Sequence, residues 1–161
     1  MINAVGTIFF SLNTKRICLG LRTNEGTYPL TWSFWGGKVE DNETFGNALA
    51  RELQEELGVL PDIVKTFPLD SFTSNDHKFK YASYVSLVAD EFSPALNEEN
   101  VGYCWVDIGS WPKPLHPGTK IILNNKNNIN KLKTILKRLP SDILVVYINK
   151  KAGNPASLLN I

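Results

Sequence analysis

The chain has 161 residues, of which 43% are hydrophobic and 20% are charged, and these values are typical of one globular domain with a sizeable core. The formal net charge of +1 excludes a strong overall attraction to nucleic acid or to an anionic membrane, so any phosphate group must be bound by a local site. The two cysteines, Cys18 and Cys104, are too few for a disulfide framework or a cysteine-ligated metal site, and they favour a reducing compartment.

No segment contains the roughly 20 consecutive apolar residues that a membrane-spanning helix needs. The apolar run at the N-terminus also lacks the preceding basic region of a secretion signal. We therefore expect a soluble, cytoplasmic protein that does not bind a membrane.

The N-terminal region predicts two strands and a loop. Residues 2–12 and 16–22 are apolar enough to be buried, and the polar turn between them indicates a hairpin or a closely spaced strand pair. Residues 23–37 carry Gly, Pro and polar side chains, which predicts a loop.

The next element is predicted to be a helix over residues 43–57. Asp41 or Asn42 is suited to cap its N-terminus. Gly58 follows at a position where helix C-termini favour glycine.

The rest of the chain predicts three strands, a helix and a final strand. The three strands are expected at 62–72, 78–92 and 101–108. Residues 119–139 place apolar side chains at helical spacing, with Lys and Arg concentrated in the last turns, which predicts one helix. A strand-like segment, 142–148, follows. This order of elements predicts an α/β fold with a mixed β-sheet.

The predicted helix carries three acidic residues close together. At about 100° per residue, Glu52, Glu55 and Glu56 lie within an arc of roughly 100° beside an apolar stripe. Their mutual repulsion would be relieved by a hard divalent cation such as Mg²⁺, and Arg51 can hold one of the acids by a charge-assisted hydrogen bond. Taken alone, the segment is more often a solvated charged face of a surface helix.

The flanking residues make the interpretation specific. From Gly37 to Val59 the sequence reads G-x5-E-x7-R-E-L-x-E-E-x-G-V. It resembles, at every specified position, the signature of the Nudix hydrolases, enzymes that cleave nucleoside diphosphates linked to another moiety. A chance match is expected in far fewer than about one in a million chains of ordinary composition. The resemblance implies a Nudix-type α/β/α sandwich over residues 1–139. It leaves 140–161 as a C-terminal extension that adds an edge strand or forms a dimer contact.

The resemblance also implies a metal site on the helix. Glu52, Glu55 and Glu56 would bind Mg²⁺ or Mn²⁺, and Arg51 would orient a catalytic glutamate. If the base lies within the signature itself, Glu52 is the residue to test. Glu43 would support this set. The implied reaction is the attack of a metal-activated water on one phosphorus of a pyrophosphate.

The loop before the helix is expected to bind substrate. Gly36 and Gly37 would let the loop turn tightly and approach the site, and Lys38 follows them. Trp35 stands where the family commonly has a proline. Its ring could stack on a nucleobase, although an aromatic residue beside a sheet is more often part of the core.

Two residues outside the signature are candidates for a catalytic base or a further ligand. Many family members have an acidic residue in a later loop, and in the segment 97–100 we choose Glu99 over Glu98. His116 precedes the last predicted helix, where the GDP-mannose hydrolases of the family have a catalytic histidine. A solvated acidic loop and an ordinary loop histidine are the alternatives.

The function expected from these features is that of a Mg²⁺-dependent pyrophosphohydrolase acting on a nucleoside triphosphate or a nucleotide sugar. The alternatives are a GDP-sugar glycosyl hydrolase using His116, an RNA 5′-end pyrophosphohydrolase and a non-catalytic nucleotide sensor. Sensors usually lose signature glutamates, which this chain retains. The net charge argues against a nucleic-acid partner, and the expected partners are a small nucleotide and a second copy of the chain in a homodimer.

Overall fold

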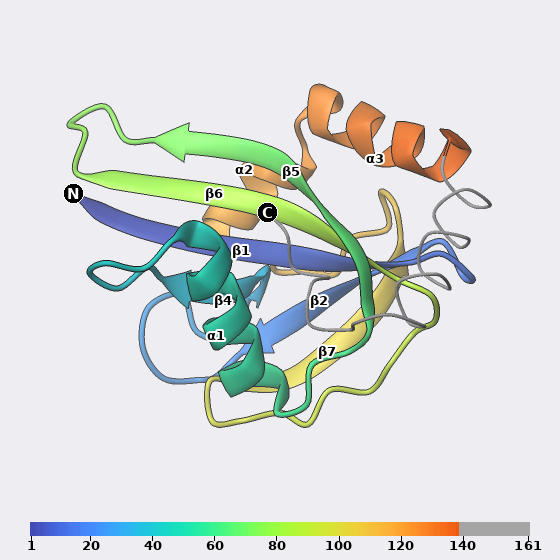
Figure 1. Cartoon of the computed structure of the whole chain (residues 1–161), viewed down its shortest axis with the longest axis horizontal. Helices are drawn as coiled ribbons and strands as arrows, with labels where there is room; N and C mark the ends of the chain where they lie inside the picture. Colours follow the sequence, from blue (N-terminus) through green and yellow to red (C-terminus); the bar gives the residue numbers. More distant parts are fainter. Residues whose placement is uncertain (139–161) are drawn as a thin grey trace.

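Strand β1 is the centre of a seven-stranded mixed sheet (Figure 1). The computed structural model describes residues 1–138. β1 pairs in parallel with β6 and antiparallel with β2 and β4. β5 pairs with β6, while β3 and β7 pair with β2. The strands are β1 (Ile2–Ser11), β2 (Arg16–Arg22), β3 (Trp32–Ser33), β4 (Trp35–Lys38), β5 (Ile63–Thr73), β6 (Phe79–Val88) and β7 (Asn100–Asp107).

Helices cover both faces of this sheet. Successive side chains of β1 point to opposite sides, so its apolar residues give each face a core for helices to cover. Ile8 and Phe10 belong to a core beneath α2 (Pro117–Leu123) and α3 (Lys126–Arg138). Phe9 belongs to a second core beneath α1 (Phe45–Leu57). Figure 1 shows α1 in front of the sheet, α2 behind it and α3 at the upper right beside β5. The arrangement is an α/β/α sandwich with a mixed sheet, which confirms the predicted fold class.

Helix α1 begins later than predicted. Thr44 is its N-cap, with a side-chain oxygen that accepts from the Asn47 N–H at 3.1 Å. The prediction that Asp41 or Asn42 caps the helix is wrong, because both lie in a turn in which Asn42 has a φ of 65°. Gly58, with a φ of 71°, ends the helix as predicted.

The predicted loop at 23–37 contains strand β3 and most of β4, so that prediction is wrong for these residues. β4 forms because Trp35 to Lys38 pair with Ala4 to Thr7 of β1. Strand β1 is distant in the sequence from β4, so the residues around β4 give no local signal of the pairing. The pairing holds Gly36 and Gly37 against β1, the central strand.

The single helix predicted over 119–139 is also wrong, since α2 and α3 are separate. Asn124 ends α2, and the Asn125 side chain accepts from the backbone N–H groups of residues 127 and 128 at the start of α3. Asn128 then ties the junction to the sheet, because its amide donates to Asp70 at 2.7 Å and to the Ile122 carbonyl at 3.0 Å.

Two earlier expectations fall outside the described part of the chain: the strand at 142–148 and the roles of the extension 140–161. Within residues 1–138, none of the helices combines the length and apolar character that crossing a bilayer requires.

The packing of α2 gives a testable prediction. We expect Ile122→Ala to lower the free energy of unfolding by about 2 to 5 kcal/mol, because buried methyl groups are lost and a cavity is left. Ile121→Ala is the matched control, since Ile121 is 69% exposed and Ile122 only 6%. Its effect should stay within about 0.5 kcal/mol. Urea unfolding of both variants measures the difference, and equal losses would contradict this orientation of the helix.

Candidate active site

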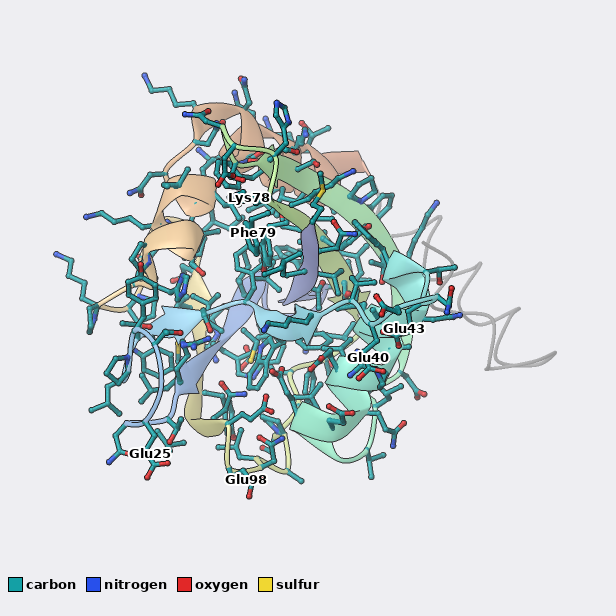
Figure 2. The ribbon with its side chains drawn as sticks, turned by 90° about the vertical axis from the view of Figure 1, so that its left-hand side faces the viewer. Glu25, Glu40, Glu43, Lys78, Phe79 and Glu98 are labelled. Carbon is teal, nitrogen blue, oxygen red and sulfur yellow. The ribbon has the colours of Figure 1, made fainter. Side chains whose placement is uncertain are left out.

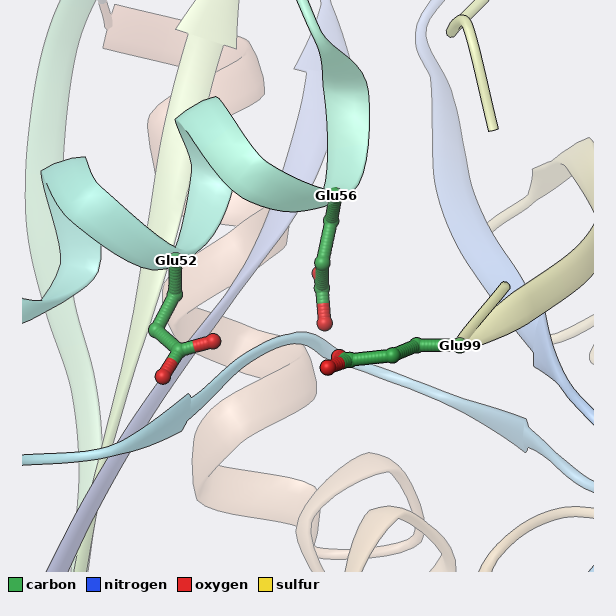
Figure 3. A group of neighbouring side chains, drawn as sticks. All are labelled: Glu52, Glu56 and Glu99. Carbon is green, nitrogen blue, oxygen red and sulfur yellow. The ribbon is translucent and has the colours of Figure 1, made fainter. Parts of the chain in front are cut away.

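Three carboxylates meet beside α1 (Figure 3). Glu52 and Glu56 project from neighbouring turns of the helix, and Glu99 comes from the segment that leads into β7. One oxygen from each of the three side chains lies within 4.8 Å of the others. Glu98 is exposed and points away from the molecule in Figure 2. The structure therefore brings Glu99, and not Glu98, to the two helix carboxylates.

Burial makes this cluster electrostatically unfavourable when all its members are ionised. Glu52 and Glu56 are only 8% and 4% exposed. Burial raises the pKa of Glu56 well above its ordinary value, and the charges of Glu99 and Glu52 raise it further. The Gly36 N–H, which donates to Glu56 at 3.1 Å, and the Asn100 side chain oppose this rise in the Glu56 pKa. Burial also raises the pKa of Glu52.

The cluster has the chemistry of a site for a hard divalent cation. Its donors are carboxylate oxygens, which Mg²⁺ and Mn²⁺ prefer, and a cation would offset the repulsion that raises the pKa of Glu56. The residues present therefore fit the metal that the signature implies.

The two glycines of β4 allow the close approach of strand and helix. A side chain on Gly37 would overlap the carboxylate of Glu52. Gly36 has a φ of 148° and lies against the backbone of Val5, so a side chain there would be strained and would also collide. The glycine pair thus places the β4 backbone directly beside the carboxylates.

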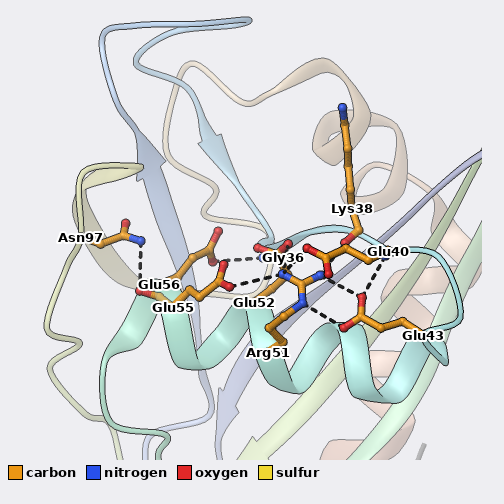
Figure 4. A network of polar contacts seen from close by, with 9 residues as sticks. All are labelled: Gly36, Lys38, Glu40, Glu43, Arg51, Glu52, Glu55, Glu56 and Asn97. Carbon is orange, nitrogen blue, oxygen red and sulfur yellow. Dashed lines mark hydrogen bonds and ion pairs between the residues drawn. The ribbon is translucent and has the colours of Figure 1, made fainter.

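Arg51 connects the helix to the preceding loop (Figure 4). Its Nε and Nη2 donate to the two carboxylate oxygens of Glu43, each at 2.9 Å. Its Nη1 donates to Glu52 at 3.0 Å, and its Nη2 also reaches the Lys38 carbonyl at 2.9 Å. The hydrogen bond from Arg51 lowers the pKa of Glu43 to about 2, with a smaller contribution from the Glu40 N–H. The ionised Glu43 therefore holds Arg51 in a position from which it orients Glu52.

Glu55 lies outside the group of three carboxylates. Its side chain is 51% exposed, and its carboxylate accepts from Arg51 at 3.4 Å. The structure thus assembles Glu52, Glu56 and Glu99, whereas the sequence analysis grouped Glu55 with the first two.

The predicted substrate-binding residues occupy different environments. Trp35 is 1% exposed in the core beneath α1, and its indole N–H donates to the Cys18 carbonyl at 3.3 Å. The expectation that its ring stacks on a nucleobase is therefore wrong, because both faces of the ring are packed against protein. The Lys38 side chain is exposed and points away from the carboxylates in Figure 4.

His116 caps α2. Its Nδ1 accepts from the Gly118 N–H at 3.0 Å, and its ring packs edge to face against Tyr28 with centroids 4.8 Å apart. Burial lowers the pKa of His116, and the charge of Arg22 lowers it further. The hydrogen bond from Gly118 uses the lone pair of Nδ1, so the other nitrogen, Nε2, carries the proton of the neutral ring.

Asn100 is a site residue that the sequence analysis did not single out. It is 6% exposed at the start of β7, and its side chain acts on Glu56 in the direction that favours ionisation. Its only sequence signal was its place directly after the candidate Glu99.

Known proteins resemble this chain in sequence. The family model of the NUDIX domain matches residues 2–125, which include the signature, Glu99 and His116. The 8-oxo-dGTP diphosphatase of Proteus vulgaris is 39% identical over 75 residues, covering 47% of this chain and 63% of that protein. Nucleoside triphosphatase NudI of Salmonella arizonae is 33% identical over 93 residues, covering 52% of this chain and 66% of that protein. The chain thus spans just under two thirds of the length of these relatives.

Solved structures share the fold. A MutT/nudix family protein from Enterococcus faecalis superposes with a TM-score of 0.67 at 18% identity, covering 90% of this chain and 66% of that one. A MutT NUDIX hydrolase from Burkholderia pseudomallei has a TM-score of 0.56 at 24% identity, covering 75% of this chain and 95% of that one. Because the family model matches most of the chain, from β1 through α2, the chain belongs to the Nudix family.

Proposed function

We propose that the protein is a Nudix pyrophosphohydrolase that cleaves a diphosphate bond in a small nucleotide and uses Mg²⁺ or Mn²⁺ as cofactor. The observation that carries the proposal is the convergence of Glu52, Glu56 and Glu99 from two separate segments, with two of the three buried. The activities named for the similar proteins, 8-oxo-dGTP diphosphatase and nucleoside triphosphatase, favour a nucleoside triphosphate over a nucleotide sugar as the substrate.

Glu52, Glu56 and Glu99 would hold the cation. When bound, a divalent cation lowers the pKa of a water molecule and neutralises charge on phosphoryl oxygens. The hydrogen bond from Arg51 orients Glu52 and opposes the rise in its pKa that burial causes. The absence of side chains on Gly36 and Gly37 leaves the β4 backbone close to the carboxylates, where a diphosphate would have to lie.

His116 is not assigned as the base in this proposal. Its Nδ1 is engaged in capping α2, and its described contacts lie with Gly118 and Tyr28 rather than with the carboxylates. This favours attack at phosphorus over attack at a sugar carbon, the reaction that a histidine base would serve.

The substrate class can be measured directly. Hydrolysis of nucleoside triphosphates, nucleotide sugars, ADP-ribose, dinucleoside polyphosphates and capped RNA should be compared in Mg²⁺ by phosphate release. Pyrophosphatase is added where the product is pyrophosphate, and alkaline phosphatase where the products are phosphate monoesters. We expect nucleoside triphosphates to give the highest rate. Binding without turnover of any compound would instead support a sensor, and preference for RNA would support end processing.

We predict that Glu56→Gln leaves the fold intact but removes nearly all turnover. Burial raises the pKa of Glu56 because it disfavours the charged form relative to water, so we expect the neutral amide to be tolerated. The amide cannot replace a charged ligand, however, and we expect at least about a thousandfold loss of kcat. Glu55→Gln is the comparison, because its side chain lies outside the group of three, and its loss should be much smaller.

Thermal unfolding and phosphate release, measured on the same preparations, test this prediction. Turnover of Glu56→Gln within about threefold of wild type would refute the metal assignment, since that corresponds to less than about 1 kcal/mol in the transition state.

The roles of Glu99 and His116 can be separated by matched substitutions. We predict that Glu99→Gln lowers kcat/KM by more than about a hundredfold, while Glu98→Gln, the adjacent exposed control, stays within about twofold. His116→Asn removes the imidazole yet supplies an oxygen that can still cap α2, and it should cost less than about tenfold.

The pH profile gives an independent readout of the same question. A histidine base near its ordinary pKa of about 6.5 would make the rate fall below neutrality, whereas attack served by the glutamates favours alkaline pH. If His116→Asn proves more damaging than Glu99→Gln, the nucleotide-sugar alternative gains support. The product that carries label from heavy-oxygen water would then distinguish attack at carbon from attack at phosphorus.

A further inference from the structure

Glu99 lies on a different segment from Glu52 and Glu56, so something must fix the distance between them. The segment 89–99 runs from β6 to β7 and passes the C-terminal end of α1. The Ala95 N–H donates to the Leu57 carbonyl at 3.3 Å, which fixes the segment near the last turn of the helix. This backbone contact lies four residues before Glu99 and does not involve the residues adjacent to it.

One side chain joins the helix to Glu99 itself. The Asn97 amide nitrogen donates to the Glu55 carbonyl at 3.0 Å, a contact drawn in Figure 4. The Asn97 side-chain oxygen accepts from the Glu99 backbone N–H at 2.9 Å. A single short side chain therefore spans from the turn of α1 that lies between Glu52 and Glu56 to the backbone that carries the third carboxylate.

The backbone carbonyl of Glu99 is also held in place. Its carbonyl accepts from the Thr23 N–H at 3.0 Å, at the end of β2. Together, the contacts from Thr23 and Asn97 fix both peptide groups that flank the Glu99 Cα. The Thr23 contact fixes the position of Glu99 relative to the sheet. The Asn97 contact fixes it relative to the helix that carries the other two carboxylates.

We propose that Asn97 is a positioning residue that sets the place of Glu99 relative to Glu52 and Glu56, and thereby sets the affinity of the carboxylate site for its divalent cation. This inference rests on the proposed function, because it takes the three carboxylates as the metal ligands. Asn97 itself supplies no ligand, since its amide nitrogen and its oxygen are both engaged with backbone groups.

Two substitutions separate the loss of both hydrogen bonds from the loss of the bond to the helix alone. Asn97→Ala removes both. Asn97→Ser keeps an oxygen that can accept from the backbone N–H two residues later, but it cannot reach the helix. Ser93→Ala is the matched control, because it removes another anchor of the same segment, the 3.1 Å bond between Ser93 and the Tyr103 hydroxyl, without touching Glu99.

The primary measurement is Mn²⁺ affinity of the full chain without substrate, from the electron paramagnetic resonance signal of free Mn²⁺. We expect Asn97→Ala to weaken Mn²⁺ binding by about tenfold to a hundredfold, the range typical when the partner that orients a metal ligand is removed. Asn97→Ser should weaken it less than Asn97→Ala, and Ser93→Ala should stay within about twofold of wild type. The metal-free melting temperatures of Asn97→Ala and Ser93→Ala should be similar.

Turnover should show the same defect as a dependence on metal concentration. We expect Asn97→Ala to need more Mg²⁺ for half-maximal rate but to approach the wild-type kcat when Mg²⁺ is saturating. Wild-type Mn²⁺ affinity in Asn97→Ala, or an equal loss in Ser93→Ala, would overturn the positioning role.

Glu56→Gln separates this proposal from the one on which it rests. If wild type binds Mn²⁺, Glu56→Gln does not, and Asn97→Ala binds as wild type does, then only the role of Asn97 is wrong. If wild type itself shows no Mn²⁺ binding at millimolar concentrations, the metal site and the role of Asn97 are both overturned.

Discussion

The burial of Glu52 and Glu56 on neighbouring turns of α1 is the constraint that explains most of the surrounding structure. Two carboxylates with 8% and 4% exposure cannot keep a hydration shell, and their charges repel each other. Nor can the helix rotate to expose them, because its neighbouring face packs Leu49 and Leu53 into the core with no exposed surface. Groups of the protein therefore have to donate the hydrogen bonds that water would give to exposed carboxylates.

These donors differ for the two acids. Glu52 receives a charged donor, Arg51, which is itself held by the ionised Glu43. Glu56 receives the Gly36 N–H, a neutral donor, and its pKa remains raised. Burial nevertheless raises the pKa of Glu52 as well, and it raises that of Glu56 well above its ordinary value. A bound cation would therefore favour the ionised form of both acids.

The sequence could predict the helix and its acids because their signal is local. The signature fixes the spacing of Glu52 and Glu56, and helical geometry places them on one face whatever the rest of the chain does. Arg51 was also predictable as the residue that orients an acid, since it is adjacent to Glu52. Glu55 fulfils the same spacing rule, yet it faces Arg51 and solvent, because the direction of a side chain at the edge of the arc depends on which neighbours the fold provides.

The features that sequence could not predict depend on partners distant in the chain. β4 exists because β1 pairs with it, and Trp35 is buried for the same reason, since pairing turns its ring into the core under α1. The break between α2 and α3 has a local part, the Asn125 side chain that caps α3, and a distant part, the bond from Asn128 to Asp70 in β5. The predictions made from local patterns failed where these contacts decide the structure.

Binding of a cation to the three carboxylates would also change the free energy of unfolding. A cation that binds the folded carboxylates and not the unfolded chain stabilises the fold by RT ln(1 + [L]/Kd). Because the pKa of Glu56 is raised in the metal-free chain, a cation that binds its carboxylate would compete with a proton. The ionisation of Glu56 and the binding of the cation would therefore be coupled. A substitution that loosens the segment at Asn97 would act on the chemistry through metal affinity, without touching a reacting atom.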